Sequence, residues 1–207
     1  MKSALKALER LREGNERFLS GTPRIGNRTN DARIGDLVSS TPFAIVLGCA
    51  DARVPAEIVF DQGLGDLFVV RVAANVLAPS IVGSIELATD LFGCPLVLIL
   101  GHSRCGAVQA TVDHLDSPAV AISPNLNAIV KRIRPIAETV RRDEPSRDRD
   151  TIVEQVVREN INASVDGLCA MSTALSRRVQ EEKLLVVGAK YALETGVVEF
   201  FRDGDSQ

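Results

Sequence analysis

Two short segments of the chain carry the residues best suited to bind a metal ion. The first is Cys49-Ala-Asp51-Ala-Arg53, and the second is His102-Ser-Arg-Cys105. Two Cys and one His suit a tetrahedral zinc site, and three protein ligands leave the fourth position open, as in catalytic sites. We therefore predict that Cys49, His102 and Cys105 bind Zn²⁺. The alternative is that both Cys are small buried apolar residues and that His102 caps a turn.

The same kind of element precedes each of these segments. Residues 43–48 read Phe-Ala-Ile-Val-Leu-Gly, and residues 96–101 read Leu-Val-Leu-Ile-Leu-Gly. Short apolar runs rich in Val and Ile are typical of buried strands in a parallel sheet. Reactive groups in such sheets gather just beyond the carboxyl ends of the strands. The pattern therefore predicts that two strand ends bring two thiols and an imidazole to one edge of a sheet.

Asp51 and Arg53 stand two and four residues after the first Cys. Zinc with two thiolates and a neutral imidazole has no net charge, so it acidifies a bound water less strongly than zinc with three imidazoles does. A carboxylate can orient the bound hydroxide, and an Arg can hold that carboxylate through two parallel hydrogen bonds. We predict that Asp51 orients the hydroxide and that Arg53 keeps Asp51 off the metal. The alternative for this pair is a structural salt bridge.

Strands and helices alternate along the chain, which implies right-handed crossovers and a parallel sheet. Besides 43–48 and 96–101, we expect strands at 66–72 and 184–188 and an antiparallel strand at 196–201. Helices are expected at 3–20, 55–61, 80–92, 105–116, 125–141 and 150–181. The predicted fold is α/β: a four-stranded mostly parallel sheet with an antiparallel edge strand, flanked by helices. We expect one domain over 1–207, in which 1–41 form an N-terminal helical arm and its connection.

The bulk properties argue against several classes of partner. A net charge of −3 and a pI near 5.5 disfavour nucleic acid and anionic membranes. No apolar segment approaches the roughly 20 residues that cross a bilayer, and the N-terminus lacks the apolar stretch of a secretory signal. The four Cys contain no Cys-x-x-Cys pair and do not suggest a disulfide framework. We expect a cytoplasmic protein.

These motifs resemble those of the β-class carbonic anhydrases, and the resemblance covers nearly the whole chain. The matching segments are Cys49-Ala-Asp-Ala-Arg-Val-Pro, Phe68-Val-Val-Arg, Gly83-Ser-Ile-Glu and Gly101-His-Ser-Arg-Cys-Gly-Ala. The resemblance implies reversible hydration of carbon dioxide to bicarbonate by a zinc-bound hydroxide. It also implies a homodimer or homotetramer in which N-terminal helices wrap the partner. The family's ligands map onto Cys49, His102 and Cys105, and its dyad maps onto Asp51 and Arg53.

The resemblance also suggests residues of a substrate pocket. It places Phe68 and Ala73 in the apolar wall that holds carbon dioxide, although core packing alone would also explain both. Other members carry a Gln near the start of the first strand and a Tyr after the Ile-Glu pair. The matching positions here are Ser40 and Leu87. We therefore expect different hydrogen bonding to bound bicarbonate.

One departure concerns regulation. Some members carry a Trp three residues before the first Cys, which forms an inhibitory bicarbonate site with an Arg and a Tyr. The Trp position is Val46 here, although Arg71 and Tyr191 match the other two. We therefore expect no inhibitory site and a metal whose fourth position stays open.

Two other functions fit the same residues. A related zinc hydrolase would direct the same hydroxide at carbon disulfide or carbonyl sulfide, and pocket width would decide between the substrates. A non-catalytic, zinc-stabilised regulatory module would need the metal alone. The Asp51 and Arg53 pair counts against the module, because a structural zinc has no use for it.

Overall fold

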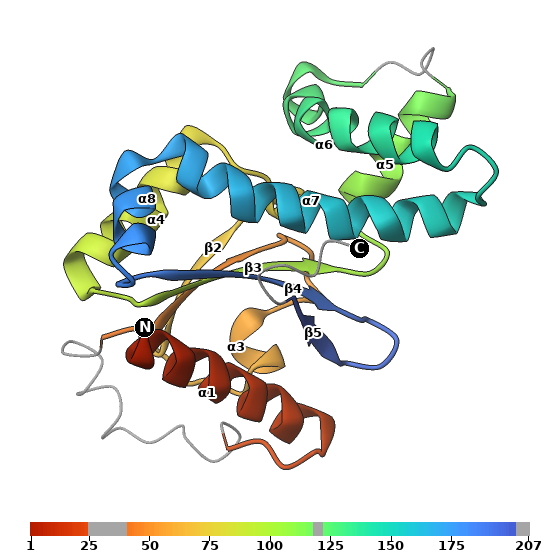
Figure 1. The fold of residues 1–207 in the computed structure, drawn as a ribbon. Helices are drawn as coiled ribbons and strands as arrows, with labels where there is room; N and C mark the ends of the chain where they lie inside the picture. The colour runs from red at the N-terminus through yellow and green to blue at the C-terminus, as the bar shows by residue number, and fades with distance from the viewer. Residues whose placement is uncertain (25–40, 118–121, 202–207) are drawn as a thin grey trace.

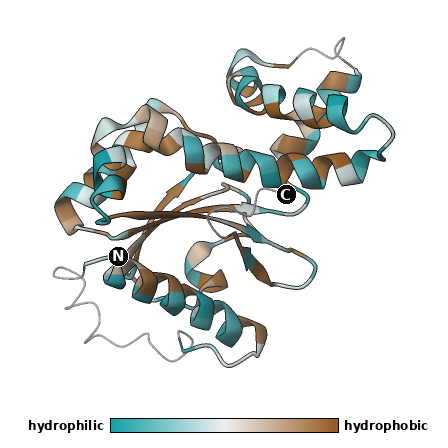
Figure 2. Cartoon of the chain, in the orientation of Figure 1, coloured by the Kyte–Doolittle hydropathy of each residue, from teal (hydrophilic) through white to brown (hydrophobic). Residues whose placement is uncertain are grey.

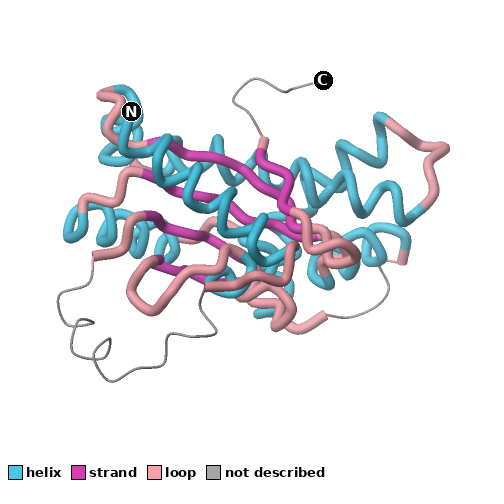
Figure 3. Tube along the Cα trace, turned by 90° about the horizontal axis from the view of Figure 1, so that it is seen from below, coloured by secondary structure: helices cyan, strands magenta, loops and turns pink. Residues whose placement is uncertain are grey.

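A five-stranded sheet forms the centre of the molecule. The computed structural model describes residues 1–24, 41–117 and 122–201. The strands are β1 (Ala44–Gly48), β2 (Leu67–Arg71), β3 (Leu96–His102), β4 (Leu185–Tyr191) and β5 (Val198–Phe200). Their order is β2-β1-β3-β4-β5, and β1 to β4 are parallel whereas β5 is an antiparallel edge strand. The predicted fold class is confirmed, and Figure 3 shows the strands side by side.

Helices cover both faces of the sheet (Figure 1). The helical elements are α1 (Lys2–Leu19), α3 (Ala56–Val59), the 3₁₀ turn η3 (Ala73–Asn75), α4 (Pro79–Phe92), α5 (Gly106–Asp116), α6 (Pro124–Asp143), α7 (Arg149–Met171) and α8 (Thr173–Gln180). α1 and α3 lie on one face, and α4, α7 and α8 lie on the other, where α5 and α6 pack against α7. Among the described residues, no helix has both the length and the apolar composition that a membrane crossing requires.

The central strands β1, β3 and β4 are mostly buried and apolar because helices cover both faces of the sheet, whereas the edge strand β2 is half-buried (Figure 2). Successive side chains of a strand point to opposite faces. Ile45 and Leu47 of β1 therefore pack into the core cluster shared with α4, α5, α6 and α7. Val46, between them, packs into the second cluster, shared with α1 and α3.

α1 is anchored on the sheet of its own chain. Leu11 is fully buried in the second cluster. The buried Asn15 amide donates to the carbonyls of Val59 (3.1 Å) and Gly196 (3.0 Å). Its oxygen accepts a hydrogen bond from the backbone N–H of Val198 (3.0 Å). α1 thereby joins the α3 turn to β5, which are far apart in the sequence.

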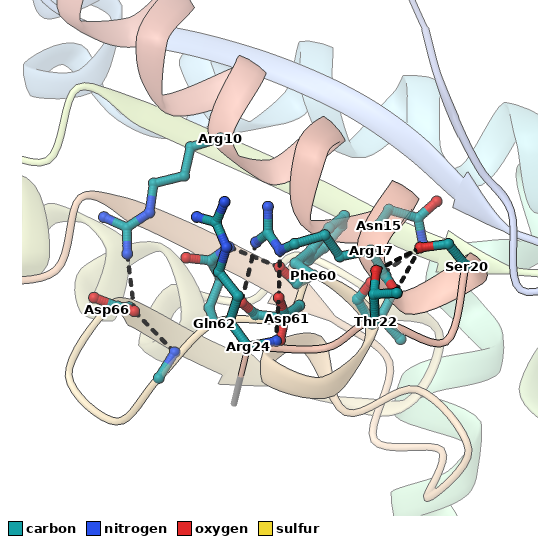
Figure 4. Close-up of polar contacts among 12 residues, drawn as sticks. Arg10, Asn15, Arg17, Ser20, Thr22, Arg24, Phe60, Asp61, Gln62 and Asp66 are labelled. Atoms are coloured by element: carbon teal, nitrogen blue, oxygen red, sulfur yellow. Dashed lines mark hydrogen bonds and ion pairs between the residues drawn. The ribbon is translucent and has the colours of Figure 1, made fainter. Parts of the chain in front are cut away.

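Ion pairs extend this anchorage along the segment that follows α3 (Figure 4). Arg17 donates to the fully buried Asp61 carboxylate at 2.5 Å, and the backbone N–H of Arg24 reaches the same carboxylate at 2.9 Å. Arg10 pairs with Asp66 at 2.9 Å. The expected N-terminal arm therefore begins as a helix that covers its own chain, and 25–40 lie outside the described residues.

Two predicted helices have the wrong extent. The expected helix over 150–181 is divided at Ser172, whose backbone is extended (φ −137°, ψ 109°). The buried Ser172 hydroxyl accepts a hydrogen bond from the backbone N–H of Leu175 at 3.1 Å, so it caps α8 and replaces the helical bond that continuity would supply. The helix expected at 55–61 is the single turn α3, because Asp61 adopts the left-handed conformation (φ 46°).

Candidate metal centre

Three buried side chains converge at the carboxyl ends of β1 and β3. Cys49 directly follows β1, His102 is the last residue of β3, and Cys105 is the N-cap of α5. The strands are neighbours in register, with Gly48 beside Leu100, so their ends meet at one edge of the sheet. The two Sγ atoms and a ring nitrogen of His102 all lie within 4.8 Å of one another. The structure thus brings together the three residues that the sequence singled out.

The His102 ring is prepared to bind a metal through Nε2. Its Nδ1 lies 2.8 Å from the carbonyl oxygen of Ser103, so Nδ1 carries the hydrogen and donates to that oxygen. Nε2 is buried and has no hydrogen-bond partner among the described residues. An unpartnered buried nitrogen is costly, and it lies with two thiols, which are soft ligands. The donor set and its geometry fit Zn²⁺.

The environment of the two thiols favours a thiolate. The Cys105 thiol lowers the pKa of Cys49 to about 4, against the opposing effect of burial, and the backbone N–H of Ala74 also donates to Cys49 Sγ at 3.3 Å. The Cys49 sulfur raises the pKa of Cys105, and burial adds to this effect. Burial disfavours the charged form of His102, but the Cys49 sulfur raises the pKa of the ring overall. Within the cluster, Cys49 is therefore the thiol that favours the thiolate form.

Asp51 and Arg53 form a bidentate ion pair beside the cluster. Arg53 Nε lies 2.9 Å from Asp51 Oδ1, and a terminal guanidinium nitrogen lies 2.7 Å from Oδ2. The backbone N–H of Arg53 also donates to Oδ1 at 2.9 Å. These bonds hold the pKa of Asp51 well below its usual range. The ionised carboxylate therefore rests on Arg53. Its Oδ2 is 3.9 Å from His102 Nε2, which places it beside the three clustered residues.

Arg71 supports the loop that carries Cys49 and Asp51. Its Nε donates to the carbonyl oxygen of Cys49 at 2.9 Å, and its terminal nitrogen donates to the carbonyl oxygen of Asp51. The sequence placed Arg71 in a segment that resembles the family and matched it to the Arg of an inhibitory site, but it did not predict this contact. The available signal was its place at the end of β2, in register with Gly48 at the end of β1.

The residues expected in a substrate pocket are spread more widely. Phe68 is half-buried on β2 and packs against the core cluster that includes Cys49. Ala73 is half-buried in η3, next to the residue that donates to Cys49. Leu87 lies on α4 and is 52% exposed. Ser40 lies outside the described residues, and the pocket assignments remain predictions.

Comparison with known proteins identifies the family. The family model described as carbonic anhydrase matches residues 44–198, which include Cys49, His102 and Cys105. Carbonic anhydrase 2 of Mycobacterium tuberculosis is 39% identical over 190 residues, covering 92% of this chain and 89% of the relative. The chain belongs to the β-class carbonic anhydrase family. This membership bears out the expected class of enzyme.

Solved β-carbonic anhydrases share the architecture. The crystal structure of CafA from Aspergillus fumigatus superimposes with a TM-score of 0.72 at 25% identity and covers 82% of each chain. A structure from a study of two tetrameric β-carbonic anhydrases of Sordaria macrospora also superimposes on this chain, with a TM-score of 0.72 at 21% identity. The match covers 86% of this chain and 90% of that one. At 21% identity, this second similarity shows a shared fold alone.

Proposed function

We propose that this β-class carbonic anhydrase catalyses the zinc-dependent, reversible hydration of carbon dioxide to bicarbonate and a proton. The observation that carries the proposal is the buried Nε2 of His102, which has no hydrogen-bond partner in the described part of the chain. It lies with the sulfurs of Cys49 and Cys105, beside a carboxylate that Arg53 holds in place. Three ligands leave a fourth position for water, which suits catalysis rather than purely structural zinc.

Each residue of the site has a distinct task in this proposal. When bound, zinc supplies a Lewis acid that lowers the pKa of a coordinated water. Two thiolates offset the charge of the ion, so the residues around it must assist the reaction. Asp51 accepts a hydrogen bond from the attacking water and turns a lone pair of that water towards the carbon of carbon dioxide. Its lowered pKa keeps Asp51 ionised, and therefore an acceptor, at neutral pH.

Arg53 keeps Asp51 in this role. Asp51 Oδ2 is only 3.9 Å from His102 Nε2, so a small rotation would bring the carboxylate to the metal position. The two side-chain hydrogen bonds from Arg53 oppose that rotation. Since the Arg53 side chain is 56% exposed, geometry rather than a strong buried charge pair is what holds Asp51.

The wider assignment completes the proposal. We place Phe68, Ala73 and Leu87 in the pocket for carbon dioxide and bicarbonate, within one domain spanning residues 1–207. We also propose a homodimer or homotetramer. Exposed apolar side chains on α4, Leu87 (52%) and Leu91 (66%), give this helix a surface that a second copy would cover. The tetrameric assembly named for the Sordaria macrospora relatives supports the same proposal.

Zinc content and stopped-flow hydration of carbon dioxide test the function together. Cys49→Ala, His102→Ala and Cys105→Ala should each lose most of the bound zinc and the activity. Cys169→Ala is the matched control, because Cys169 is a half-buried thiol on α7 outside the cluster. Full zinc content in a ligand variant would remove that residue from the set. Turnover of carbon disulfide or carbonyl sulfide above that of carbon dioxide would favour the related hydrolase.

Arg53→Ala tests the dyad separately. The variant should keep its zinc but lose nearly all hydration activity, since the released Asp51 can occupy the open position. Metal content by elemental analysis and turnover by stopped flow measure the two effects. Near-normal turnover with zinc bound would contradict the role given to Arg53.

A further inference from the structure

One peptide group joins the metal-binding histidine to a carboxylate on α7. The group lies between Ser103 and Arg104, in the loop from His102 to Cys105. Its carbonyl oxygen accepts the hydrogen bond from His102 Nδ1 at 2.8 Å. Its N–H, which belongs to Arg104, donates to Oε1 of Glu154 at 3.2 Å. The orientation of this peptide therefore serves two partners on opposite sides.

This orientation is not one that the loop would adopt by default. Arg104 has φ 54°, in the left-handed region that residues with a Cβ rarely occupy. Such a conformation persists only where its surroundings hold it. Rotation of the peptide towards a relaxed conformation would turn the Ser103 carbonyl away from His102 Nδ1. The ring would then lose the bond that fixes its orientation.

Contacts from β4 and the turn after it fix the residues on either side of the peptide. The backbone N–H of Ser103 donates to the carbonyl of Tyr191 at 2.9 Å, and its hydroxyl donates to Glu194 at 2.9 Å. Arg104 Nε pairs with Glu194 at 2.6 Å. These contacts anchor the side chains and the preceding N–H. Within the part of the chain that the structure describes, the peptide N–H itself donates to Glu154.

We propose that Glu154 is a positioning residue for His102, acting through the Ser103–Arg104 peptide. The inference rests on the proposed metal site. Glu154 holds the peptide so that its carbonyl keeps the hydrogen on Nδ1 of His102, which leaves the lone pair of Nε2 free for the metal. Outer partners of metal-binding histidines typically fix the tautomer and the ring in this way. Here the partner carboxylate acts through one intervening peptide group.

The contribution of Glu154 is mainly its acceptor oxygen and not its charge. The side chain is 39% exposed, so solvent screens its field. Its second oxygen faces the ammonium of Lys190 at 3.3 Å, which offsets the charge further. Gln at this position retains an oxygen that can accept from Arg104, whereas Met retains the size of the side chain and has no comparable acceptor. The two substitutions therefore separate the two contributions.

Zinc affinity, measured by competition with a chromophoric chelator, tests the proposal without relying on activity. Glu154→Met should weaken zinc binding about 10-fold to 100-fold, the usual effect of losing an outer partner. Glu154→Gln should stay within about 5-fold of wild type, as expected for a screened charge. Glu159→Met is the control, because Glu159 is a half-buried carboxylate on the same helix that contacts Asn162. Glu154→Ala is a second acceptor-free variant should Met impair folding.

Nitrogen-15 NMR of the histidine rings distinguishes positioning from general stability. The chain has two His, so His114→Gln leaves His102 as the only imidazole signal. In the zinc-loaded Glu154→Met protein, the Nδ1–H proton of His102 should shift upfield and exchange faster with water. A purely structural role would lower thermal stability and leave this signal unchanged, which would overturn the inference.

The outcomes also separate this inference from the proposed function. Unchanged zinc affinity in Glu154→Met and Glu154→Ala, with zinc bound by wild type through Cys49, His102 and Cys105, would overturn the inference alone. Wild-type protein that binds no zinc would overturn the metal site and the inference with it. Equal losses in the Met and Gln variants would also refute the argument, because they would assign the effect to charge.

Discussion

Gly14→Ala sets helix propensity against packing. Gly14 lies in the interior of α1, where replacement of Gly by Ala normally stabilises a helix by about 1 kcal/mol. A Cβ built on Gly14, however, would lie 1.8 Å from the carbonyl oxygen of Phe60 and 2.9 Å from Gln62 Nε2. The Phe60 oxygen belongs to the backbone, so it cannot move aside as a flexible side chain can. The helix itself must shift.

The size of this shift decides the sign of the effect. Carbon–oxygen contacts in proteins are normally about 3.3 Å or longer, so α1 must move away by about 1.5 Å. A movement of that size breaks the three hydrogen bonds of Asn15, the next residue along the helix. At about 1 kcal/mol each, they contribute about 3 kcal/mol. After the gain in propensity, Gly14→Ala should destabilise the protein by about 2 kcal/mol.

Urea unfolding followed by circular dichroism measures this prediction, with Gly83→Ala as the control. Gly83 is an exposed residue in the interior of α4, and a Cβ there meets no atom of the described segments within 4 Å. Gly83→Ala should therefore raise the free energy of unfolding by about 1 kcal/mol. The reasoning would be refuted if both substitutions stabilised the protein equally, since the contact with Phe60 would then have no energetic cost.

Three further substitutions test other parts of the fold by urea unfolding. Ser172→Ala should lower the free energy of unfolding by about 1 kcal/mol, because α8 loses its N-cap, and an unchanged value would contradict the capping role. Asp113→Asn should cost at most about 1 kcal/mol at pH 7, since the pair with Arg149 is exposed. Arg149 lowers the pKa of Asp113, so the ion pair stabilises the fold above about pH 4, and this stabilisation disappears as the pH falls through the folded-state pKa of Asp113. A difference in unfolding free energy between Asp113→Asn and wild type that persists at about pH 2 would refute this assignment. Gly101→Ala should cost about 1–3 kcal/mol, because its Cβ would lie 2.5 Å from Ile161, and adding Ile161→Val should recover part of the loss.

The sequence predicted the sheet and the meeting of the three site residues because both follow from local pattern. Apolar runs that end in Gly marked β1, β3 and β4, and parallel strands present their carboxyl ends at one edge. The structure adds a reason for two of these glycines. A Cβ at Gly101 or Gly188 would lie within 3 Å of Ile161, so the glycines let α7 approach the sheet closely. A Cβ at Gly48 would have no neighbour within 4 Å among the residues that the structure describes.

The features that the sequence did not predict depend on contacts between distant segments. Ser172 lies in an uninterrupted helical pattern, and only its buried environment shows that its hydroxyl caps α8. It also donates to Glu86 on α4 at 2.5 Å, a partner that local periodicity cannot reveal. Arg71 and Glu154 reach the site from β2 and α7. Arg71 is marked only by its place at the end of a predicted strand. Glu154 is an ordinary surface type, and nothing in its spacing distinguishes it from other charged residues.

α7 contributes none of the three clustered side chains, yet it supports both strained loops beside them. Ala74 (φ 56°) and Arg104 (φ 54°) are left-handed residues with a Cβ, a conformation that costs roughly 1–2 kcal/mol each. The amide of Asn160 on α7 donates to the carbonyl of Ala74 at 2.8 Å, while Ala74 directs its own N–H at Cys49 Sγ. Glu154, on the same helix, accepts from the N–H of Arg104. One rigid helix thus holds the backbone on two sides of the cluster, and displacement of α7 would disturb a thiol and an imidazole together.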